Sequence, residues 1–343
     1  MSIILGIEST AHTFGIGIVK SGKILANVKD TYTTESGGII PTNAAKHHNE
    51  ISEKIYCEAL NISKISEDKI DAIAFSQGPG LSPCLLEGIR FAKKLSKRLN
   101  KPIVPVNHCI AHLEIGKVTK AKDPLMLYVS GANTQIIAYS TGKYRIFGET
   151  LDLGVGNFID TFAREIGIGF PGGPKIQQLA SVGKNYIELP YVVKGMDISL
   201  SGILTNLKQK FNSKNYSKED LCYSLQETVF AMLIESAERA LAHTGKKELL
   251  LGGGVACNSR LQEMAKKMCG ERGVKFFVPP NNLLTDNGAM IAYLGEIMFK
   301  NGFLFRKRNY NGRKTEIVFL EKDFDKLDIE PRQRTDEVDV KWK

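Results

Sequence analysis

The chain lacks the sequence features that would place it in a membrane or export it from the cell. No apolar run approaches the ~18 residues that a membrane-spanning helix needs. The first ten residues, MSIILGIEST, have no basic segment, and Glu8 interrupts the apolar stretch that a signal peptide requires. We therefore expect a soluble, cytoplasmic protein that does not contact a membrane.

Closely spaced cysteine pairs are also absent. The six cysteines stand singly, without a C-x-x-C pair, at Cys57, Cys84, Cys109, Cys222, Cys257 and Cys269. Such scattered single cysteines are typical of reduced thiols in a cytosolic protein, rather than of a disulfide framework or a thiolate zinc site.

Three common motifs of nucleotide and metal enzymes are missing as well. No G-x-x-x-x-G-K-[ST] segment occurs, which excludes a P-loop NTPase. The segment LGGGVACN at 251–258 has neither the G-x-G-x-x-G spacing nor the following acidic residue of a dinucleotide-binding fold. The segment HCIAH at 108–112 lacks the glutamate of H-E-x-x-H, the general base of zinc peptidases, which weakens a protease interpretation.

The composition is that of a folded protein with an excess of positive charge. The 343 residues are 43% hydrophobic and 24% charged, and the length predicts two domains. Lysine and arginine number 46 against 37 acidic residues, and the net charge of +9 indicates a polyanionic partner such as nucleic acid. Basic clusters at 93–101 and 306–314 fit either a nucleic-acid contact or a solvated face.

The order of the predicted elements repeats along the chain. Strands are predicted at 3–8, 14–19 and 24–32, a helix from 41 to about 60, a strand at 70–76, a helix at 84–99 and a strand at 103–106. A shift of 120 residues (141 − 21) places the Thr141-Gly142-Lys143 turn on the Ser21-Gly22-Lys23 turn, with strands on both sides of each. Further on, a strand ending at 254 opens a helix at 255–270.

This repeat predicts an α/β protein of two lobes, each built on a strand hairpin and helices, with a cleft between them. The first lobe is expected at 1–118, with the return of a helix at about 287–320. The second lobe is expected at 119–286, and a charged tail at 321–343.

Two histidines and several glycines are the candidate site residues. His108 and His112 lie four apart at the start of a predicted helix, so both imidazoles share one face and can bind one metal, although such pairs are also common packing residues. Asn107 is the predicted N-cap of this helix and Gly116 its end. Glycines at 131, 154, 156, 172, 173 and 252–254 let backbone N–H groups approach phosphate oxygens, or merely turn the chain.

Eight segments, taken together and in order, resemble the universal tRNA threonylcarbamoyladenosine transferase family, in its archaeal and eukaryotic KEOPS-subunit branch. They are GIESTAHT (6–13), SQGPGLSPCLLEGIRFAK (76–93), VNHCIAHLE (106–114), YVSGANTQI (128–136), GNFIDTFAREIG (156–167), FPGGPKI (170–176), LLGGGVACNSRL (250–261) and LLTDNGAMIAY (283–293). The resemblance covers roughly residues 3–300, and a coincidence of eight segments is far more specific than any one of them.

The resemblance implies a fold and a metal site. Members of the family have the actin/Hsp70-like (ASKHA) fold, with duplicated mixed sheets and a nucleotide and metal cleft between two lobes. His108, His112 and Asp286 match the metal ligands of the family, and Tyr128 matches the phenolate that joins them in this branch. One divalent metal per chain is implied, Fe²⁺ before Zn²⁺. An acid at the start of a predicted helix, such as Asp286, is also the ordinary choice for an N-cap.

The same resemblance assigns the positions that bind substrate and nucleotide. They are Tyr128, Val129, Ser130, Gly131, Ala132, Asp160, Gly173, Gln177 and Asn258. Gln177 stands where an acidic residue is expected, which puts one hydroxyl contact in doubt. The implied ligands are threonylcarbamoyl-AMP and ATP, and no general base can be named.

The implied activity is metal-assisted transfer of the threonylcarbamoyl group from its adenylate to N6 of an adenosine in tRNA. The target is the adenosine immediately 3′ of the anticodon in tRNAs that read ANN codons. The implied partners are tRNA and the KEOPS subunits, including a separate small atypical protein kinase/ATPase and a small dimerising subunit. Two other functions stay open, a nucleotide-binding regulatory subunit and a metallopeptidase.

Overall fold

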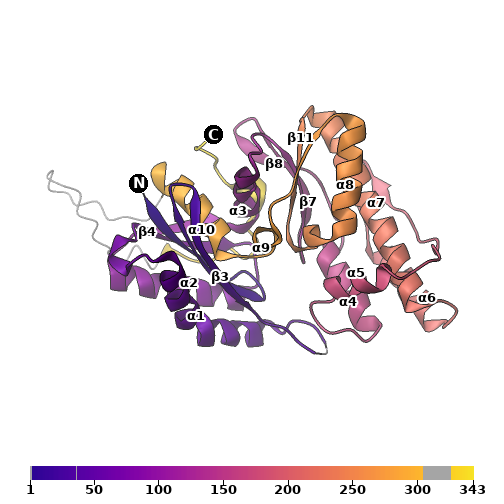
Figure 1. The fold of residues 1–343 in the computed structure, drawn as a ribbon, viewed down its shortest axis with the longest axis horizontal. Coiled ribbons are helices and arrows are strands. Elements are labelled where there is room, and N and C mark those ends of the chain that lie inside the picture. The colour runs from indigo at the N-terminus through magenta and orange to yellow at the C-terminus, as the bar shows by residue number, and fades with distance from the viewer. Residues whose placement is uncertain (1, 36, 304–325) are drawn as a thin grey trace. The chain divides into compact units, whose positions relative to one another are not determined.

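The computed structural model describes residues 2–35, 37–303 and 326–343, which divide into two compact units (Figure 1). Unit 1 comprises Met1–Tyr32, Ile39–Ile115 and Asp286–Lys343, and unit 2 comprises Thr33–Gly38 and Gly116–Thr285. Among the described residues, no helix is long and apolar enough to cross a bilayer.

Each unit is a mixed α/β structure. Unit 1 contains β1 (Ile3–Glu8), β2 (Thr13–Lys20), β3 (Lys23–Thr31), α1 (Pro41–Ser63), β4 (Ala72–Gly78), α2 (Ser82–Leu99), β5 (Ile103–Asn107), α3 (His108–Ile115) and α10 (Gly288–Lys300). Unit 2 contains β6 (Leu125–Val129), β7 (Thr134–Ser140), β8 (Lys143–Glu149), α4 (Val155–Glu165), α5 (Gly173–Ala180), β9 (Val193–Lys194), β10 (Asp197–Ile198), α6 (Ser201–Asn212), α7 (Lys218–Thr244), β11 (Glu248–Gly252), α8 (Ser259–Arg272), β12 (Lys275–Phe277) and α9 (Asn281–Leu284).

The two units share one sheet topology, which confirms the predicted duplication. Unit 1 has the strand order β3-β2-β1-β4-β5 and unit 2 the equivalent order β8-β7-β6-β11-β12. In unit 1, β1 is antiparallel to β2 and parallel to β4. In unit 2, β6 is likewise antiparallel to β7 and parallel to β11. The two turns that the sequence aligns also agree, because Ser21 and Gly22 have φ of 51° and 75°, and Thr141 and Gly142 have 48° and 81°. Positive φ at both central residues gives the twist that a two-residue hairpin needs.

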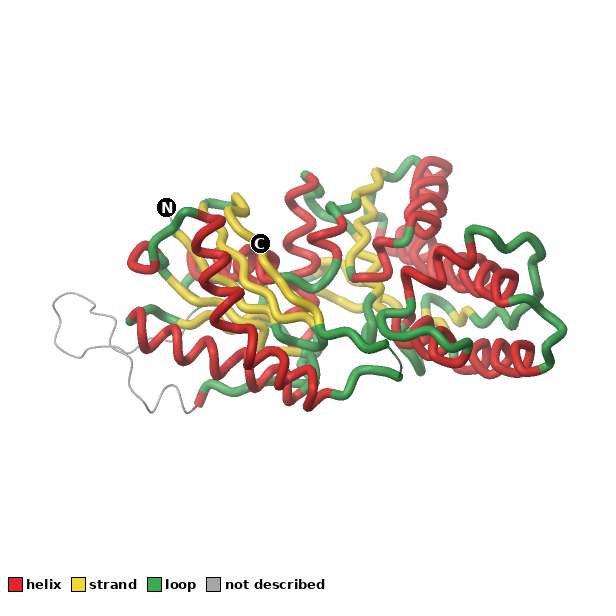
Figure 2. The backbone as a smooth tube through the Cα atoms, turned by 60° about the horizontal axis from the view of Figure 1, so that its bottom comes forward, coloured by secondary structure: helices red, strands yellow, loops and turns green. Residues whose placement is uncertain are grey.

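The sheet of unit 1 is covered on both faces, as its almost wholly apolar strands require. Its helices, red in Figure 2, run along the yellow strands. On β1, Leu5 and Ile7 join a buried cluster with Tyr56 of α1 and Phe91 of α2. The intervening Gly6 faces α10, since a Cβ atom there would lie 2.2 Å from the backbone nitrogen of Ala292.

Glycines on the strands let α10 approach the sheet closely. A Cβ atom on Gly17 of β2 would lie 2.2 Å from the backbone nitrogen of Ala289, and one on Gly288 would lie 2.2 Å from the nitrogen of Gly17. These neighbours are backbone atoms that cannot rotate away, so only glycine is accommodated. The contact fixes the start of α10, and with it the position of Asp286 and Asn287, the two residues that precede this helix.

Unit 2 is built around α7. The hydroxyl of Ser217 accepts a hydrogen bond from the backbone N–H of Asp220 and caps the helix, and Gly245 ends it with φ of 68°. Between these ends, buried residues such as Leu225, Val229 and Leu233 join the core that also contains the strands of this unit.

The C-terminal residues differ from a simple charged tail. Residues 321–325 and the expected helix beyond 303 lie outside the described residues. Residues 326–343 belong to unit 1, where Leu327 and Val340 are buried. Charge patterning missed these contacts because a few apolar side chains among many charged ones are enough to anchor a segment whose regular structure is one short 3-10 helix, Thr335–Glu337.

Candidate metal centre

The two histidines lie on α3, whose ends are those predicted from the sequence. The Oδ1 atom of Asn107 accepts a hydrogen bond from the backbone N–H of Ile110 at 3.0 Å, which makes Asn107 the N-cap. The helix ends at Ile115, directly before Gly116. His108 and His112 are one turn apart and buried, and their ring centroids are 4.8 Å apart. Both therefore face the same point within unit 1.

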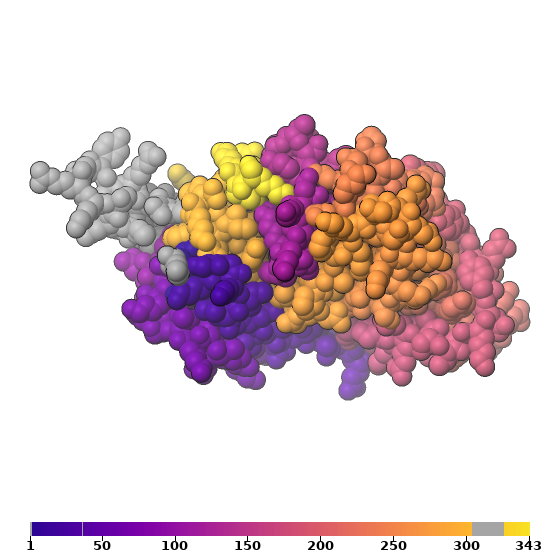
Figure 3. Space-filling view, turned by 45° about the horizontal axis from the view of Figure 1, so that its top comes forward, coloured from indigo at the N-terminus to yellow at the C-terminus, as the bar shows by residue number. Residues whose placement is uncertain are grey.

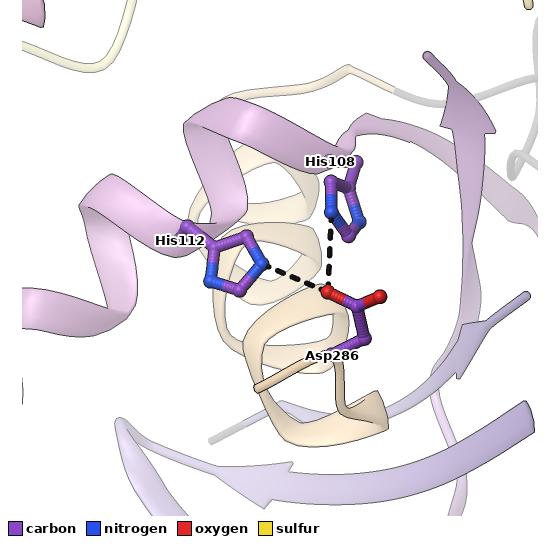
Figure 4. A group of neighbouring side chains, drawn as sticks. All are labelled: His108, His112 and Asp286. Atoms are coloured by element: carbon purple, nitrogen blue, oxygen red, sulfur yellow. Dashed lines mark hydrogen bonds and ion pairs between the residues drawn. The ribbon is translucent and has the colours of Figure 1, made fainter. Parts of the chain in front are cut away.

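Asp286 brings the third ligand atom to this point (Figure 4). Its Oδ1 atom lies 3.3 Å from Nε2 of His112 and 3.5 Å from Nε2 of His108. One ligand atom from each of the three residues lies within 4.8 Å of the others. Two imidazole nitrogens and one carboxylate oxygen at this spacing can hold one divalent metal ion.

The sequence alone allowed Asp286 to be the N-cap of the following helix, but in the structure it is not the cap. Asn287 caps α10 instead, because its Oδ1 atom accepts a hydrogen bond from the backbone N–H of Met290 at 3.0 Å. The carbonyl oxygen of Asp286 accepts a hydrogen bond from Nζ of Lys29 at 3.0 Å. The cap and this contact together direct the Asp286 carboxylate toward the histidines.

Glu8 is the residue of this centre that sequence reasoning missed. Its Oε2 atom lies 3.0 Å from Nδ1 of His108, and its Oε1 atom accepts hydrogen bonds from the backbone N–H and the hydroxyl of Thr10 at 2.7 and 2.5 Å. A carboxylate on Nδ1 fixes the ring and directs Nε2 toward a metal, as is usual for metal-bound histidines. The sequence signal was an acid closing an otherwise apolar strand, Ile3–Glu8.

The charges of the centre are coupled. Burial by itself would lower the pKa of His108, but the negative charges of Glu8 and Asp286 outweigh it and raise the pKa to about 9. Burial lowers the pKa of His112. Burial also favours the protonated form of Asp286, yet the two histidines hold its pKa below the ordinary value. The His108 ring thus lies between two carboxyl groups, and a metal bound at its Nε2 atom would replace a proton there.

The residues assigned to substrate and nucleotide lie in unit 2, and five of them end or follow β6. Tyr128 and Val129 are buried at the end of β6, and the turn that follows contains Ser130, Gly131 and Ala132. The carbonyl oxygens of Ser130 and Gly131 accept hydrogen bonds from the N–H groups of Gly156 and Asn157, at 3.0 and 2.8 Å. The turn is thereby held against the first turn of α4.

Asp160, Gly173 and Gln177 lie on α4 and α5. Asp160 accepts a hydrogen bond from the N–H of Gly172 at 2.8 Å and so holds the turn that precedes α5. Gly173 begins α5, and no atom lies within 4 Å of the position that its Cβ would take. Gln177 donates from Nε2 to the hydroxyl of Ser259 at 3.0 Å. This contact joins α5 to the start of α8.

Asn258 has a structural role that the sequence did not indicate. The helix predicted at 255–270 is a short 3-10 turn, Gly254–Cys257, followed by α8 from Ser259. Asn258 separates them because its Oδ1 atom accepts hydrogen bonds from the N–H groups of Arg260 and Leu261. Its Nδ2 atom donates to Oε1 of Gln226 at 2.9 Å. Both ends of this amide are therefore engaged within unit 2.

Two basic residues of the cluster at 93–101 form ion pairs in the structure. Lys94 and Arg98 pair with Glu53, and Arg98 also pairs with Glu67. Lys93 donates from Nζ to the carbonyl of Leu327 at 2.9 Å. Lys94 and Arg98 thus have the ion pairs of a solvated helix face. The cluster at 306–314 lies outside the described residues.

Comparison with known proteins gives matches over nearly the whole chain. The family model TsaD, tRNA N6-adenosine threonylcarbamoyltransferase, matches residues 23–293. A tRNA N6-adenosine threonylcarbamoyltransferase of Thermococcus sibiricus is 56% identical over 340 residues, which cover 99% of this chain and all of the relative. A probable bifunctional tRNA threonylcarbamoyladenosine biosynthesis protein of Methanosarcina mazei is 49% identical over 99% of this chain, but only 60% of that protein is matched.

Solved structures give the same fold at low sequence identity. HypF of T. kodakarensis matches 88% of this chain and 48% of its own length, with a TM-score of 0.62 and 14% identity. An activator of 2-hydroxyisocaproyl-CoA dehydratase from Clostridium difficile matches 87% of this chain and 96% of its own, with a TM-score of 0.53 and 12% identity. These neighbours, together with the duplicated mixed sheets, confirm the expected ASKHA-type α/β fold.

Proposed function

We propose that this member of the TsaD family of tRNA N6-adenosine threonylcarbamoyltransferases takes the threonylcarbamoyl group from threonylcarbamoyl-AMP. A metal ion would assist the transfer. It is a transferase whose substrate is tRNA and whose product is N6-threonylcarbamoyladenosine. The observation that carries this conclusion is 56% identity over the full length of a relative of that name. The proposed target is the adenosine immediately 3′ of the anticodon in tRNAs that read ANN codons.

The proposed metal ligands are His108, His112 and Asp286, with Tyr128 of unit 2 as a further predicted ligand. The geometry of the first three supports the proposal, since their ligand atoms converge and both histidines are buried. Imidazole and carboxylate ligands suit both iron and zinc. We favour Fe²⁺ over Zn²⁺ on the family resemblance, with one ion per chain.

The residues of the chain act by orientation and charge. Oε2 of Glu8 accepts a hydrogen bond from Nδ1–H of His108, so that Nε2 of this ring faces the Asp286 carboxylate. Thr10 holds Glu8 with two hydrogen bonds, and burial keeps water from competing for the same groups. A bound metal would supply a Lewis acid that holds the carbamoyl or threonyl oxygens and stabilises charge as the adenosine amine attacks.

We propose that unit 2 binds the adenylate, either of threonylcarbamoyl-AMP or of ATP. The proposed contacts are Tyr128, Val129, Ser130, Gly131, Ala132, Asp160, Gly173, Gln177 and Asn258. The open Cβ position of Gly173 at the N-terminus of α5 supports the proposal, because backbone N–H groups there can approach an anionic group. For Asn258 and Asp160 the hydrogen bonds within unit 2 favour an indirect role, in which they hold the turns that contact the ligand.

The proposed partners beyond tRNA are the KEOPS subunits, including a separate small atypical protein kinase/ATPase and a small dimerising subunit. The bifunctional relative supports this proposal, because this chain spans only 60% of that protein and the remainder is a further segment joined to the homologous part. We propose a cytoplasmic location, because the substrate is tRNA.

The test is reconstitution of the modification. The chain is incubated with tRNA, threonylcarbamoyl-AMP and the partner subunits, and the digested tRNA is analysed for the modified nucleoside by mass spectrometry. We expect modification by the wild type and none by the double variant His108→Ala/His112→Ala. The control is His243→Ala, which removes an exposed histidine from α7 and should leave activity unchanged.

Metal content is measured on the same three proteins after anaerobic purification. We expect about one ion per chain in the wild type and the control, and none in the double variant. Full occupancy in the double variant would rule out this metal centre. Absence of the modified nucleoside with every partner present would leave a nucleotide-binding regulatory subunit as the better description.

A further inference from the structure

The C-terminal segment 326–343, here named the C-terminal strap, crosses unit 1 beside the ends of β4 and β5. Its yellow atoms lie at the surface next to α10 in Figure 3. The N–H of Glu330 donates to the carbonyl of Gln77 at 2.8 Å, and Nε2 of Gln77 donates to the carbonyl of Asp328 at 2.9 Å. Leu327 is only 2% exposed and joins the core of unit 1. The strap is thus anchored before it reaches the metal centre.

The strap then contacts the start of α3 through the residue that caps this helix. Oε1 of Gln333 accepts a hydrogen bond from Nδ2 of Asn107 at 2.8 Å. The other end of the Asn107 amide, Oδ1, accepts from the N–H of Ile110. Because an asparagine amide is planar, holding Nδ2 also fixes the direction of Oδ1. Gln333 therefore sets the orientation of the N-cap directly before His108.

The end of the strap contacts the last turn of the same helix. Nε1 of Trp342 donates a hydrogen bond to Oε1 of Glu114 at 3.1 Å. Glu114 lies on α3 two residues after His112, and it is fully buried. The ring of Trp342 packs edge to face against Phe303, with centroids 5.7 Å apart. A buried carboxylate needs hydrogen-bond donors, so this contact is costly to lose.

We propose that the C-terminal strap is a positioning element for the metal helix, holding α3 at its N-cap through Gln333 and at its last turn through Trp342. These two contacts lie on either side of the His108 and His112 pair. They fix the helix in the place where both Nε2 atoms face Asp286. The effect on the helix follows from the contacts alone, whereas the effect on metal binding rests on the proposed function.

The first measurement is amide hydrogen exchange of α3 in the full chain, purified without metal. Gln333→Leu removes the acceptor for Asn107, and Trp342→Phe removes the donor to Glu114 while keeping a ring against Phe303. In both variants we expect α3 amides to exchange roughly 5- to 10-fold faster, the effect of losing one partly buried hydrogen bond. Because Nε2 of Gln333 also donates to Oε2 of Glu330 at 2.7 Å, the rescue is the double variant Gln333→Glu/Glu330→Gln, which keeps both hydrogen bonds and should restore slow exchange.

The matched control is Asp336→Asn, which alters an ion pair that the strap makes within itself, with Arg334. It should leave α3 exchange unchanged. Unchanged exchange in both Gln333→Leu and Trp342→Phe would overturn the proposal, whatever the metal does. Because Trp342 is the single tryptophan of the chain, a red shift of its fluorescence in Gln333→Leu would report release of the strap.

The second measurement is titration with Co²⁺, followed by its visible absorption. We expect Gln333→Leu and Trp342→Phe to bind Co²⁺ about 10-fold more weakly than the wild type and Asp336→Asn. Equal affinity in all four proteins would overturn the link between the strap and the metal centre. If the wild type itself binds no Co²⁺, the proposed metal centre fails, and the exchange result alone decides the role of the strap.

Discussion

Two adjacent glycines at the end of β11 are expected to respond to alanine in opposite ways. Gly253 has φ of 91° and ψ of 162°, and a Cβ atom on it would lie 2.4 Å from the carbonyl oxygen of Val129. Gly254 has no such backbone conformation, and the nearest atom to its Cβ position is Cγ2 of Thr285 at 3.9 Å. The first glycine is required by the backbone, whereas the second has open space beside it.

The magnitudes follow from these two environments. The backbone conformation of Gly253 is almost exclusive to glycine and costs other residues about 1–3 kcal/mol. The overlap with a backbone carbonyl adds about 1–3 kcal/mol, as overpacking usually does. We expect Gly253→Ala to lose about 3 kcal/mol, or roughly 6–12 °C in Tm for a domain of this size. Gly254→Ala should be neutral or gain about 0.4–1 kcal/mol, because alanine restricts the unfolded chain.

The assay is scanning calorimetry of both variants beside isothermal titration with ATP and AMP. If the adenylate lies against the glycine turn, Gly254→Ala should melt like the wild type but bind about tenfold more weakly, a loss of about 1.4 kcal/mol. Wild-type affinity in a folded Gly254→Ala protein would refute the ligand contact. A fall in Tm equal to that of Gly253→Ala would refute the difference between the two glycines.

Asn258→Ala is not a clean test of the same site, because Asn258 is a helix cap. Loss of the cap of α8 should lower stability by about 1 kcal/mol. The side chain of Gln226, which is 6% exposed, also loses its partner. We therefore expect a lower Tm in this variant with or without nucleotide.

Three further outcomes are expected. Glu8→Ala removes the carboxylate on Nδ1 of His108 and should weaken metal binding about 10- to 100-fold, measured with Co²⁺; unchanged affinity would exclude this orienting role. Gly17→Ala should lower the free energy of unfolding in urea by about 1–3 kcal/mol, because its Cβ atom would meet the backbone of α10. The control is Gly270→Ala in α8, where no atom lies within 4 Å of the Cβ position; it should raise the free energy of unfolding by about 0.5–1 kcal/mol. Burial lowers the pKa of His48 to about 4, so only the unfolded chain binds a proton there between pH 6.5 and 4, and stability should fall by about 3 kcal/mol over that range. In His48→Asn this acid-induced loss should shrink, and an identical pH slope would contradict the assignment.

Features that depend on near neighbours along the chain could be predicted from the amino-acid sequence. The hairpin turns at 21–23 and 141–143, the cap of α3 by Asn107 and the shared face of His108 and His112 all follow from residues a few positions apart. Their hydrogen bonds and side-chain directions are fixed by local backbone geometry, which residue type and spacing encode. The duplicated strand order also followed, because each unit repeats the same succession of local patterns.

The residues that complete the metal centre from distant parts of the chain could not be predicted in this way, because the fold brings them together. Glu8 reaches His108 because β1 lies in the middle of the sheet, next to β4, which in turn pairs with β5. The choice between Asp286 and Asn287 as helix cap depended on the close packing of α10 on strand glycines, far away in sequence. The role of the C-terminal strap depended on single side chains, Gln333 and Trp342, that no periodicity reveals. Such contacts are specific to three-dimensional packing, because their energies arise from burial and charge between segments whose separation along the chain carries no local signal.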